Sequence, residues 1–185
     1  MSTATQDLRL EQLLAKQDIQ ECLVRFARGM DRFDQGLYLS AFWEDAEIAA
    51  GPFVGTPLAC WNWAVPMHEA GQTLTQHALL QTSIDLAGDQ AHAETYYQFT
   101  GRNRDESLWL AGGRYIDRLE MRQQQWRIAL RTNLVEWCCL PPSAPLPFAG
   151  VPDLAANGIS SRSTDDPSYF RPLRNHRRPQ TPAAD

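Results

Sequence analysis

The sequence lacks the features that mark several large classes of protein. It contains no run of eighteen apolar residues, so no membrane-spanning helix is expected. Its first residues, MSTATQDLRLEQLL, lack the basic start and apolar block of a secretory signal. The net charge is −5, and no basic stripe runs through the body of the chain, whereas phosphate contacts need Lys and Arg. We therefore expect a cytoplasmic protein whose partners are neither membranes nor nucleic acids.

Sequence signals for bound cofactors are missing as well. There is no phosphate-binding loop, no GxGxxG motif and no cluster of metal ligands. The four cysteines, at Cys22, Cys60, Cys138 and Cys139, show no CxxC spacing. In a cytoplasmic protein we interpret them as buried, reduced thiols. The sequence thus predicts neither a zinc site nor any other cofactor.

The composition that remains is that of a folded domain. The chain has 185 residues, of which 43% are hydrophobic and 10% aromatic, which fits one domain with an appendage. Apolar residues recur at helical spacing over residues 8–32, and shorter helices are predicted over 35–43 and 57–69. A short strand at 47–50 separates the last two and ends at Gly51-Pro52.

After Gly71 the period of the pattern changes from helical to two. Gly88-Asp89 and the polar residues 122–125 mark turns, and the long strands predicted between these breaks cover 75–87, 91–104, 108–121 and 126–140. Helices followed by a meander of strands predict an α+β fold, a cone-shaped barrel of N-terminal helices packed on a strongly curved antiparallel sheet. We expect this domain to span residues 1–140. Residues 141–185 form a Pro-rich extension, which Phe148, Val151, Tyr169 and Phe170 could attach to the body or to a neighbouring subunit.

Three ionisable residues lie on faces predicted to point into the core. Asp31 ends the first helix in RFARGMDRFD, His77 lies on the strand TLTQHALLQTSIDL beside Leu79, Gln81 and Ser83, and Arg131 interrupts WRIALRTNLVEW. Each has a plain structural interpretation: a helix-end cap, a hydrogen-bonded core histidine, or an arginine paired with a core acid. Together in an apolar pocket they could remove a proton from carbon.

The order and spacing of three segments resemble the SnoaL-like branch of the nuclear transport factor 2-like superfamily. The segments are DIQECLVRFARGMDRFDQGLYLSAFWEDAEI, LTQHALLQTSIDLAGDQAHAETYY and GGRYIDRLEMRQQQWRIALRTNLVEW, and the resemblance covers residues 8–140. The chain is most similar to relatives typified by hexachlorocyclohexane dehydrochlorinase and bile-acid 7α-dehydratase. The resemblance implies that His77 takes a proton from carbon, that Asp31 orients it, and that Arg131 helps the leaving group depart.

One position departs from the pattern of the dehydratase relatives. They often carry a Tyr five residues before the Asp, whereas this chain has Phe26, so Tyr96, Tyr97 or Tyr115 would have to supply a hydroxyl. We expect the substrate to contact aromatic, thioether and amide side chains at the mouth of the cone. The candidates are Phe26, Trp61, Met67, Tyr97, Tyr115 and Asn133.

These observations predict a cofactor-independent lyase, a dehydratase-type enzyme acting on a hydrophobic alicyclic or steroid-like substrate in steroid, polyketide or xenobiotic metabolism. One alternative is a ketosteroid-type isomerase or cyclase, which needs the same base in the same pocket. Another is the non-catalytic small subunit of an aromatic-ring dioxygenase, in which Asp31 and His77 would lie too far apart to hydrogen-bond. Because a curved open sheet leaves a face uncovered, we expect a homodimer or homotrimer.

Overall fold

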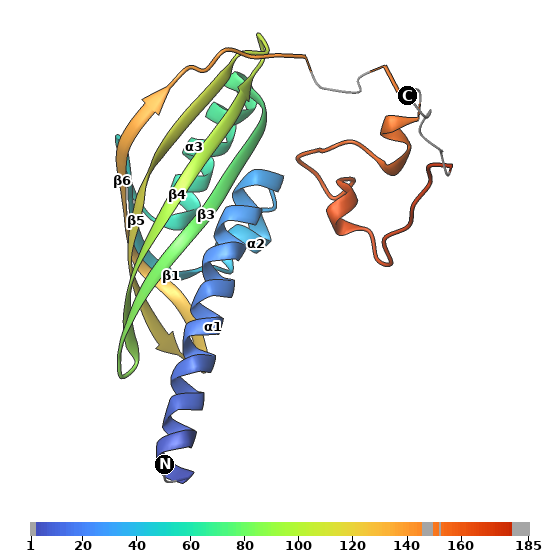
Figure 1. Cartoon of the computed structure of the whole chain (residues 1–185). Coiled ribbons are helices and arrows are strands. Elements are labelled where there is room, and N and C mark those ends of the chain that lie inside the picture. The colour runs from blue at the N-terminus through green and yellow to red at the C-terminus, as the bar shows by residue number, and fades with distance from the viewer. Residues whose placement is uncertain (1–2, 146–149, 152, 179–185) are drawn as a thin grey trace.

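The fold combines three helices with one curved, unclosed sheet (Figure 1). The computed structural model describes residues 3–145, 150–151 and 153–178. Its elements are α1 (Thr3–Arg32), α2 (Gln35–Leu39), β1 (Phe42–Ala50), β2 (Phe53–Gly55), α3 (Pro57–Gly71), β3 (Gln72–Ala87), β4 (Gln90–Asn103), β5 (Leu108–Arg122), β6 (Gln125–Cys139) and the 3₁₀ helices η1 (Leu154–Asn157) and η2 (Pro167–Tyr169). The predicted α+β fold, with helices preceding a meander of strands, is confirmed.

The sheet has the strand order β2-β1-β6-β5-β4-β3, and every pair is antiparallel except β1 with β6. The four long strands were predicted to within three residues at each end. The turn at Gly88 has a φ of 62°, a left-handed conformation that glycine adopts without a side-chain clash. The three-residue strand β2 was missed because so short a run carries no period.

The C-terminal half of α1 packs on the sheet with one face. Ile19, Leu23, Phe26, Ala27 and Met30 are buried, and their spacing of three or four residues places them on one stripe of the helix. The N-terminal part of α1 extends beyond the sheet in Figure 1, and leucines there are more than half exposed. The packed half of α1 ends at the wide part of the cone.

The second helix is shorter than the predicted 35–43. Ser40 Oγ donates a hydrogen bond to the Leu37 carbonyl oxygen at 2.7 Å, and α2 ends at Leu39. The apolar residues that follow belong to β1, where Phe42 lies beside Ile128 of β6. Pairing with a distant strand overrides the local helical pattern here, and it places β1 in the core.

A β-bulge in β3 changes the face on which side chains lie. Leu79 is paired with Tyr97 but Thr82 with Thr95, so two residues of β3 oppose one of β4. Thr75 is buried before the bulge, whereas Ile84 is buried after it. The prediction that Gln81 and Ser83 share the face of His77 is therefore wrong, because it assumed unbroken alternation.

Two of the four cysteines also differ from expectation. Cys22 and Cys60 are buried and free, but Cys138 and Cys139 are free and exposed. The pairing of β1 with β6 ends at Asn133, so the end of β6 extends past that neighbour. The prediction of buried thiols is wrong for this pair. Among the described residues, no helix is long and apolar enough to cross a membrane.

The described residues 153–178, called the tail below, run beside the C-terminal end of α1 (Figure 1). Tyr169 donates a hydrogen bond to Asp34 Oδ2 at 2.9 Å, and the Arg28 guanidinium lies 4.6 Å from the centre of the Tyr169 ring. Phe170 is 41% exposed, and Phe148 lies outside the described residues. Contact between tail and body therefore involves polar and cation–π interactions.

Candidate active site

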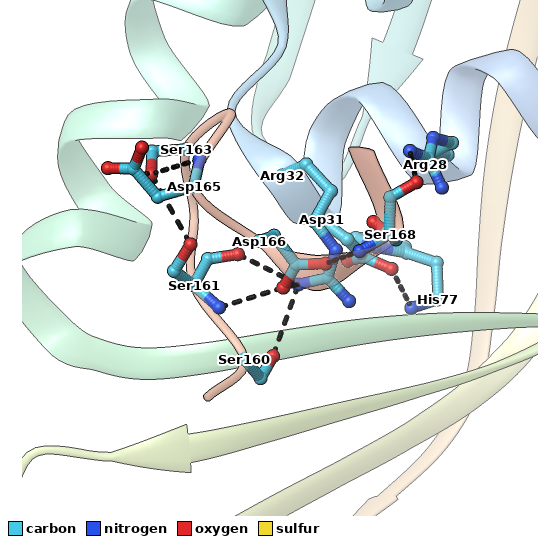
Figure 2. A network of polar contacts seen from close by, with 10 residues as sticks. All are labelled: Arg28, Asp31, Arg32, His77, Ser160, Ser161, Ser163, Asp165, Asp166 and Ser168. Carbon is cyan, nitrogen blue, oxygen red and sulfur yellow. Dashed lines mark hydrogen bonds and ion pairs between the residues drawn. The ribbon is translucent and has the colours of Figure 1, made fainter. Parts of the chain in front are cut away.

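Asp31 and His77 form a closely bonded pair. The Nδ1 atom of His77 lies 2.7 Å from Oδ1 of Asp31, and the backbone N–H of His77 donates to Oδ2 at 2.8 Å (Figure 2). The side chain of His77 is 9% exposed and that of Asp31 is 10% exposed. One carboxylate therefore holds both the backbone and the ring of the same histidine.

This arrangement defines the protonation pattern of the ring. An ionised carboxylate only accepts hydrogen bonds, so the proton of neutral His77 is assigned to Nδ1. The lone pair is then on Nε2. Phe99 and Phe26 meet the His77 ring edge-on, with ring centres 4.8 and 6.0 Å away. Such a histidine can accept a proton at Nε2 while Asp31 stabilises the imidazolium that results.

His77 lines a cavity of about 330 Å³ inside the cone. Most of its wall is aromatic or aliphatic. Besides His77 it is lined by Phe26, Met30, Tyr38, Ile48, Ala50, Gly51, Pro52, Cys60, Trp63, Ala64, Met67, His68, Tyr97, Phe99, Trp109, Ala111, Tyr115, Arg131, Asn133 and Val135. Asp31 is absent from this wall because it lies behind His77.

Arg131 reaches the same cavity but is already paired with an acid. Its Nε and Nη2 atoms each donate to a carboxylate oxygen of Asp117 at 2.7 Å, and both side chains are almost completely buried. Burial is the largest single influence and would lower the pKa of Arg131, but the charge of Asp117 and its hydrogen bonds together outweigh burial, and the pKa is raised. The guanidinium lies 4.0 Å from the ring centre of Phe26 and 4.3 Å from that of Tyr115.

The Nη1 atom of Arg131 has a different environment. It is buried and has no hydrogen-bond partner among the described residues. The ion pair with Asp117 leaves this N–H without an acceptor in the described protein, and the Arg131 side chain is part of the cavity wall. An ion pair with one spare donor can polarise a bound oxygen or halogen without placing a full net charge in the apolar interior.

Five of the six predicted substrate-contacting residues line the cavity: Phe26, Met67, Tyr97, Tyr115 and Asn133. Trp61 is not among the residues that line this cavity, its ring lies 5.1 Å from that of Tyr38, and its contact with a substrate stays a prediction. Residues two apart on a helix point in nearly opposite directions, so Trp63 occupies the cavity wall instead.

Tyrosines in the cavity wall carry the hydroxyl group that Phe26 lacks. Tyr97 and Tyr115 line the cavity, with rings stacked 4.2 Å apart, whereas Tyr96 lies on the other face and is 38% exposed. Burial raises the pKa of Tyr97 and of Tyr115, so both phenols remain protonated donors at neutral pH. Tyr38 also lines the cavity, and burial raises its pKa too.

The sequence matches the SnoaL-like domain over residues 11–132. The chain belongs to the SnoaL-like family. No curated protein matches the sequence. Two solved hexachlorocyclohexane dehydrochlorinases share the fold. The type 2 protein has a TM-score of 0.67 at 17% identity and covers 77% of this chain and 99% of its own. The LinA-type3 protein from Novosphingobium barchaimii has a TM-score of 0.66 at 16% identity over 75% and 97%.

A third neighbour, from Nostoc punctiforme, is described as a protein of unknown function with a cystatin-like fold. It has a TM-score of 0.57 at 21% identity and covers 66% of this chain and 92% of its own. The predicted family and the dehydrochlorinase-like fold are confirmed, and the likeness to bile-acid dehydratase remains a prediction.

Within the SnoaL-like domain, sequence reasoning missed three polar residues of the site. They are Asp117, Tyr38 and His68. His68 lines the cavity, its Nδ1 lies 2.7 Å from Gln72 Oε1, and burial is the main cause that lowers its pKa. The signal that could have found Asp117 is its place two residues after Tyr115, on the same strand face. Across the described residues, no group of three or more His, Cys, Asp or Glu side chains could hold a metal ion.

Proposed function

We propose that this protein is a cofactor-independent lyase that catalyses a dehydratase-type β-elimination. The observation that carries the proposal is the Asp31–His77 pair, with its 2.7 Å contact, at the wall of an apolar cavity. A base held next to its target contributes about 10²- to 10⁴-fold to proton removal from carbon. Proton transfer of this kind requires neither a metal nor a redox cofactor.

In the proposed reaction His77 Nε2 accepts a proton from a substrate carbon, and Asp31 stabilises the imidazolium. The electron pair of the broken C–H bond forms the new double bond. The leaving group on the neighbouring carbon departs with the electron pair of the bond that joined it to that carbon. Arg131 Nη1 and the hydroxyls of Tyr97 and Tyr115 would donate hydrogen bonds to that leaving group. In a dehydration the departing hydroxyl receives a proton from the His77 imidazolium and leaves as water, which returns His77 to its neutral form.

The cavity supports a compact, hydrophobic ring as the substrate. Its volume of about 330 Å³ lies near the lower end of the range for ligand pockets, which is roughly 300–1,000 Å³. Aromatic rings form much of the wall and would bury the faces of an alicyclic or steroid-like molecule. The few polar atoms lie around His77, Arg131 and the tyrosines, where the reacting carbons would be oriented.

The geometry bears on the alternatives. A non-catalytic small subunit would leave Asp31 and His77 apart, and their 2.7 Å contact favours catalysis. An isomerase would use the same base but return the proton to another carbon. Product mass separates the two reactions, because elimination releases a molecule and isomerisation leaves the mass unchanged.

The test is to assay alicyclic β-hydroxy ketones and halogenated cyclohexanes, detecting products by mass spectrometry, with the wild type and His77→Gln. We expect His77→Gln to lower turnover by about 10²- to 10⁴-fold. His92→Gln is the matched control, because His92 is exposed on β4, and its turnover should be unchanged. Near-normal turnover by His77→Gln would end the proposal.

We also propose that the chain self-associates through the exposed end of β6, where Val135 is 56% and Trp137 47% exposed. Light scattering should give a mass of two or three chains. Trp137→Glu should shift that mass toward the monomer, and a monomeric wild type would contradict the proposal.

A further inference from the structure

The tail brings polar groups to the end of α1, next to the Asp31–His77 pair. Arg32 Nη1 donates to the Ser161 carbonyl oxygen at 3.2 Å and lies 3.9 Å from Asp166 Oδ2. Arg28 Nη2 donates to the Ser168 carbonyl oxygen at 3.3 Å, and Figure 2 shows these groups around Asp31. None of these tail residues lies within the family domain at residues 11–132. The contacts are therefore an addition to the common SnoaL-like architecture.

One tail residue joins the elements that carry the pair. The Arg162 Nη1 atom donates to the carbonyl oxygens of His68 at 3.1 Å and Gln72 at 2.9 Å, where α3 ends and β3 begins. Its guanidinium also lies 4.5 Å from the centre of the Phe33 ring, directly after α1. Arg162 thus connects the end of α1, which presents Asp31, to the start of β3, which presents His77.

The positive charge of Arg162 lies near the C-terminal end of α3. A cation near a helix C-terminus interacts favourably with the helix dipole, and Arg162 occupies that position on α3. Burial lowers the pKa of Arg162, and the negative charge of Asp31 opposes that shift. The other charged or titratable groups around this point are His68 and Glu69 of α3, Arg32 of α1, Arg104 of the β4–β5 connection and Tyr115 of β5.

We propose that Arg162 is a positioning residue for the Asp31–His77 pair, and that the tail thereby completes the active site. The catalytic importance of Arg162 rests on the proposed function, whereas its role in holding Asp31 and His77 together does not depend on that function. Arg162 bonds to the α3–β3 junction and contacts Phe33 at the end of α1, so it fixes the position of β3 relative to α1. The short hydrogen bond between Asp31 and His77 depends on that position.

Arg104 offers a matched control. It also donates hydrogen bonds to the end of α3, to the carbonyl oxygens of Glu69 and Ala70 at 2.6–3.2 Å. In the described structure it is Arg162, and not Arg104, that lies over the Phe33 ring and donates to the Gln72 carbonyl oxygen. Arg104→Gln removes a cation from the same helix end without touching the link to α1. An effect that depends only on the stability of α3 would be the same in both variants.

The experiment is NMR spectroscopy of the full chain with labelled histidine, which requires no substrate. The sequence has four histidines, so the Nδ1–H resonance of His77 can be assigned by its loss in His77→Gln. In wild type we expect this proton far downfield, as for a short bond to a carboxylate. In Arg162→Met it should move upfield or broaden, and the pKa of His68 should rise because a nearby cation is gone. Arg162→Lys should restore the pKa of His68 and part of the His77 signal.

Circular dichroism would establish that each variant is folded, and Arg162→Gln, which also removes the cation, takes the place of Arg162→Met if the latter does not fold. The proposal is overturned if Arg162→Met leaves the His77 resonance and the pKa of His68 unchanged, or if Arg104→Gln changes them equally. Once a substrate is known, Arg162→Met should lower kcat about tenfold with little change in KM. If instead His77→Gln proves fully active while the NMR changes occur, the proposed function fails and the positioning role of Arg162 stands.

Discussion

At the scale of single residues, Asp31 is held by two bonds to one partner. Both oxygens of its carboxylate accept hydrogen bonds from His77, one from the backbone and one from the ring. The pair consequently fixes the orientation of the imidazole as well as its tautomer. In addition, the rotamer of Asp31 cannot change without breaking a bond to β3.

These two hydrogen bonds between Asp31 and His77 predict a specific effect of Asp31→Asn. The amide keeps the size of the side chain but loses the charge that stabilises the imidazolium. We expect kcat to fall by about 10²- to 10⁴-fold while substrate binding changes little, as measured by steady-state kinetics beside a ligand-binding titration. A loss confined to KM would argue that Asp31 acts in binding and not in proton transfer.

The Asp117–Arg131 pair gives a second prediction, on stability. Asp117→Asn leaves a buried guanidinium without its counter-charge, which costs about 3–5 kcal/mol of unfolding free energy in comparable cases. The double variant Asp117→Leu/Arg131→Met removes both charges and should recover most of that loss. Urea denaturation of the three proteins measures both steps. A single variant as stable as wild type would contradict the interpretation of this pair.

The period of each element was enough to place His77 and Asp31 on inward faces, whereas their pairing was expected only from the family resemblance. The pairing of Asp117 with Arg131, in contrast, depends on the register between β5 and β6. The hairpin begins with Arg122 opposite Gln125, and simple counting from there places Asp117 opposite Leu130. A bulge between Arg118 and Leu119 shifts the pairing by one residue, so that Asp117 faces Arg131. A one-residue shift of this kind leaves no trace in composition or period.

At the scale of elements, bulges give the sheet its curvature and the cavity its wall. The β5–β6 register shifts again between Gly112 and Gly113. A Cβ atom on Gly113 would lie 1.9 Å from the Leu134 carbonyl oxygen, so only glycine permits this approach of the two strands. The sequence predicted the strands correctly because each is long and periodic, but the bend depends on contacts between strands that are distant along the chain.

The β5–β6 turn offers a prediction at this scale. Gln123 and Gln124 have φ values of 52° and 60°, as in a type I′ turn, which favours Asn-Gly. We expect Gln123→Asn/Gln124→Gly to raise the unfolding free energy by about 1 kcal/mol, because residues with side chains are strained at positive φ. Thermal unfolding should show an increase in Tm of about 2–4 °C. Gln125→Asn, next to the turn, is the control, and an equal gain there would contradict the explanation.

At the scale of the whole molecule, the cone and the tail differ in how far the sequence predicts them. The cone follows from apolar periods and places His77 on the wall of a cavity that Asp31 and Arg131 adjoin. The contacts of the tail are single polar pairs such as Tyr169 with Asp34. Such pairs join residues 90 to 140 positions apart and follow no period. The sequence predicted apolar attachment points for the tail, whereas its contacts in the described structure are hydrogen bonds and cation–π contacts, which no sequence period reveals.

The attachment of the tail to α1 should depend on pH through the ionisation of Asp166. Although burial opposes ionisation, hydrogen bonds from Ser168 and Ser161 and the nearby Arg32 lower the pKa of Asp166 to about 2. A carboxyl whose pKa is lower in the folded state stabilises it above its ordinary pKa near 3.8, and that contribution is lost as the pH falls toward 2. The attachment of the tail to α1 should therefore hold at pH 4 and weaken below it.

NMR titration of the Ser161 and Ser168 amides, which both donate to Asp166, measures this directly. With a pKa of about 2, only about a tenth of the change in chemical shift should have occurred at pH 3. Arg32→Gln removes the nearby cation and should move the change to higher pH. If wild type instead titrates with a midpoint near 4, Asp166 is not held by these partners, and the tail is attached to the active site less firmly than its contacts indicate.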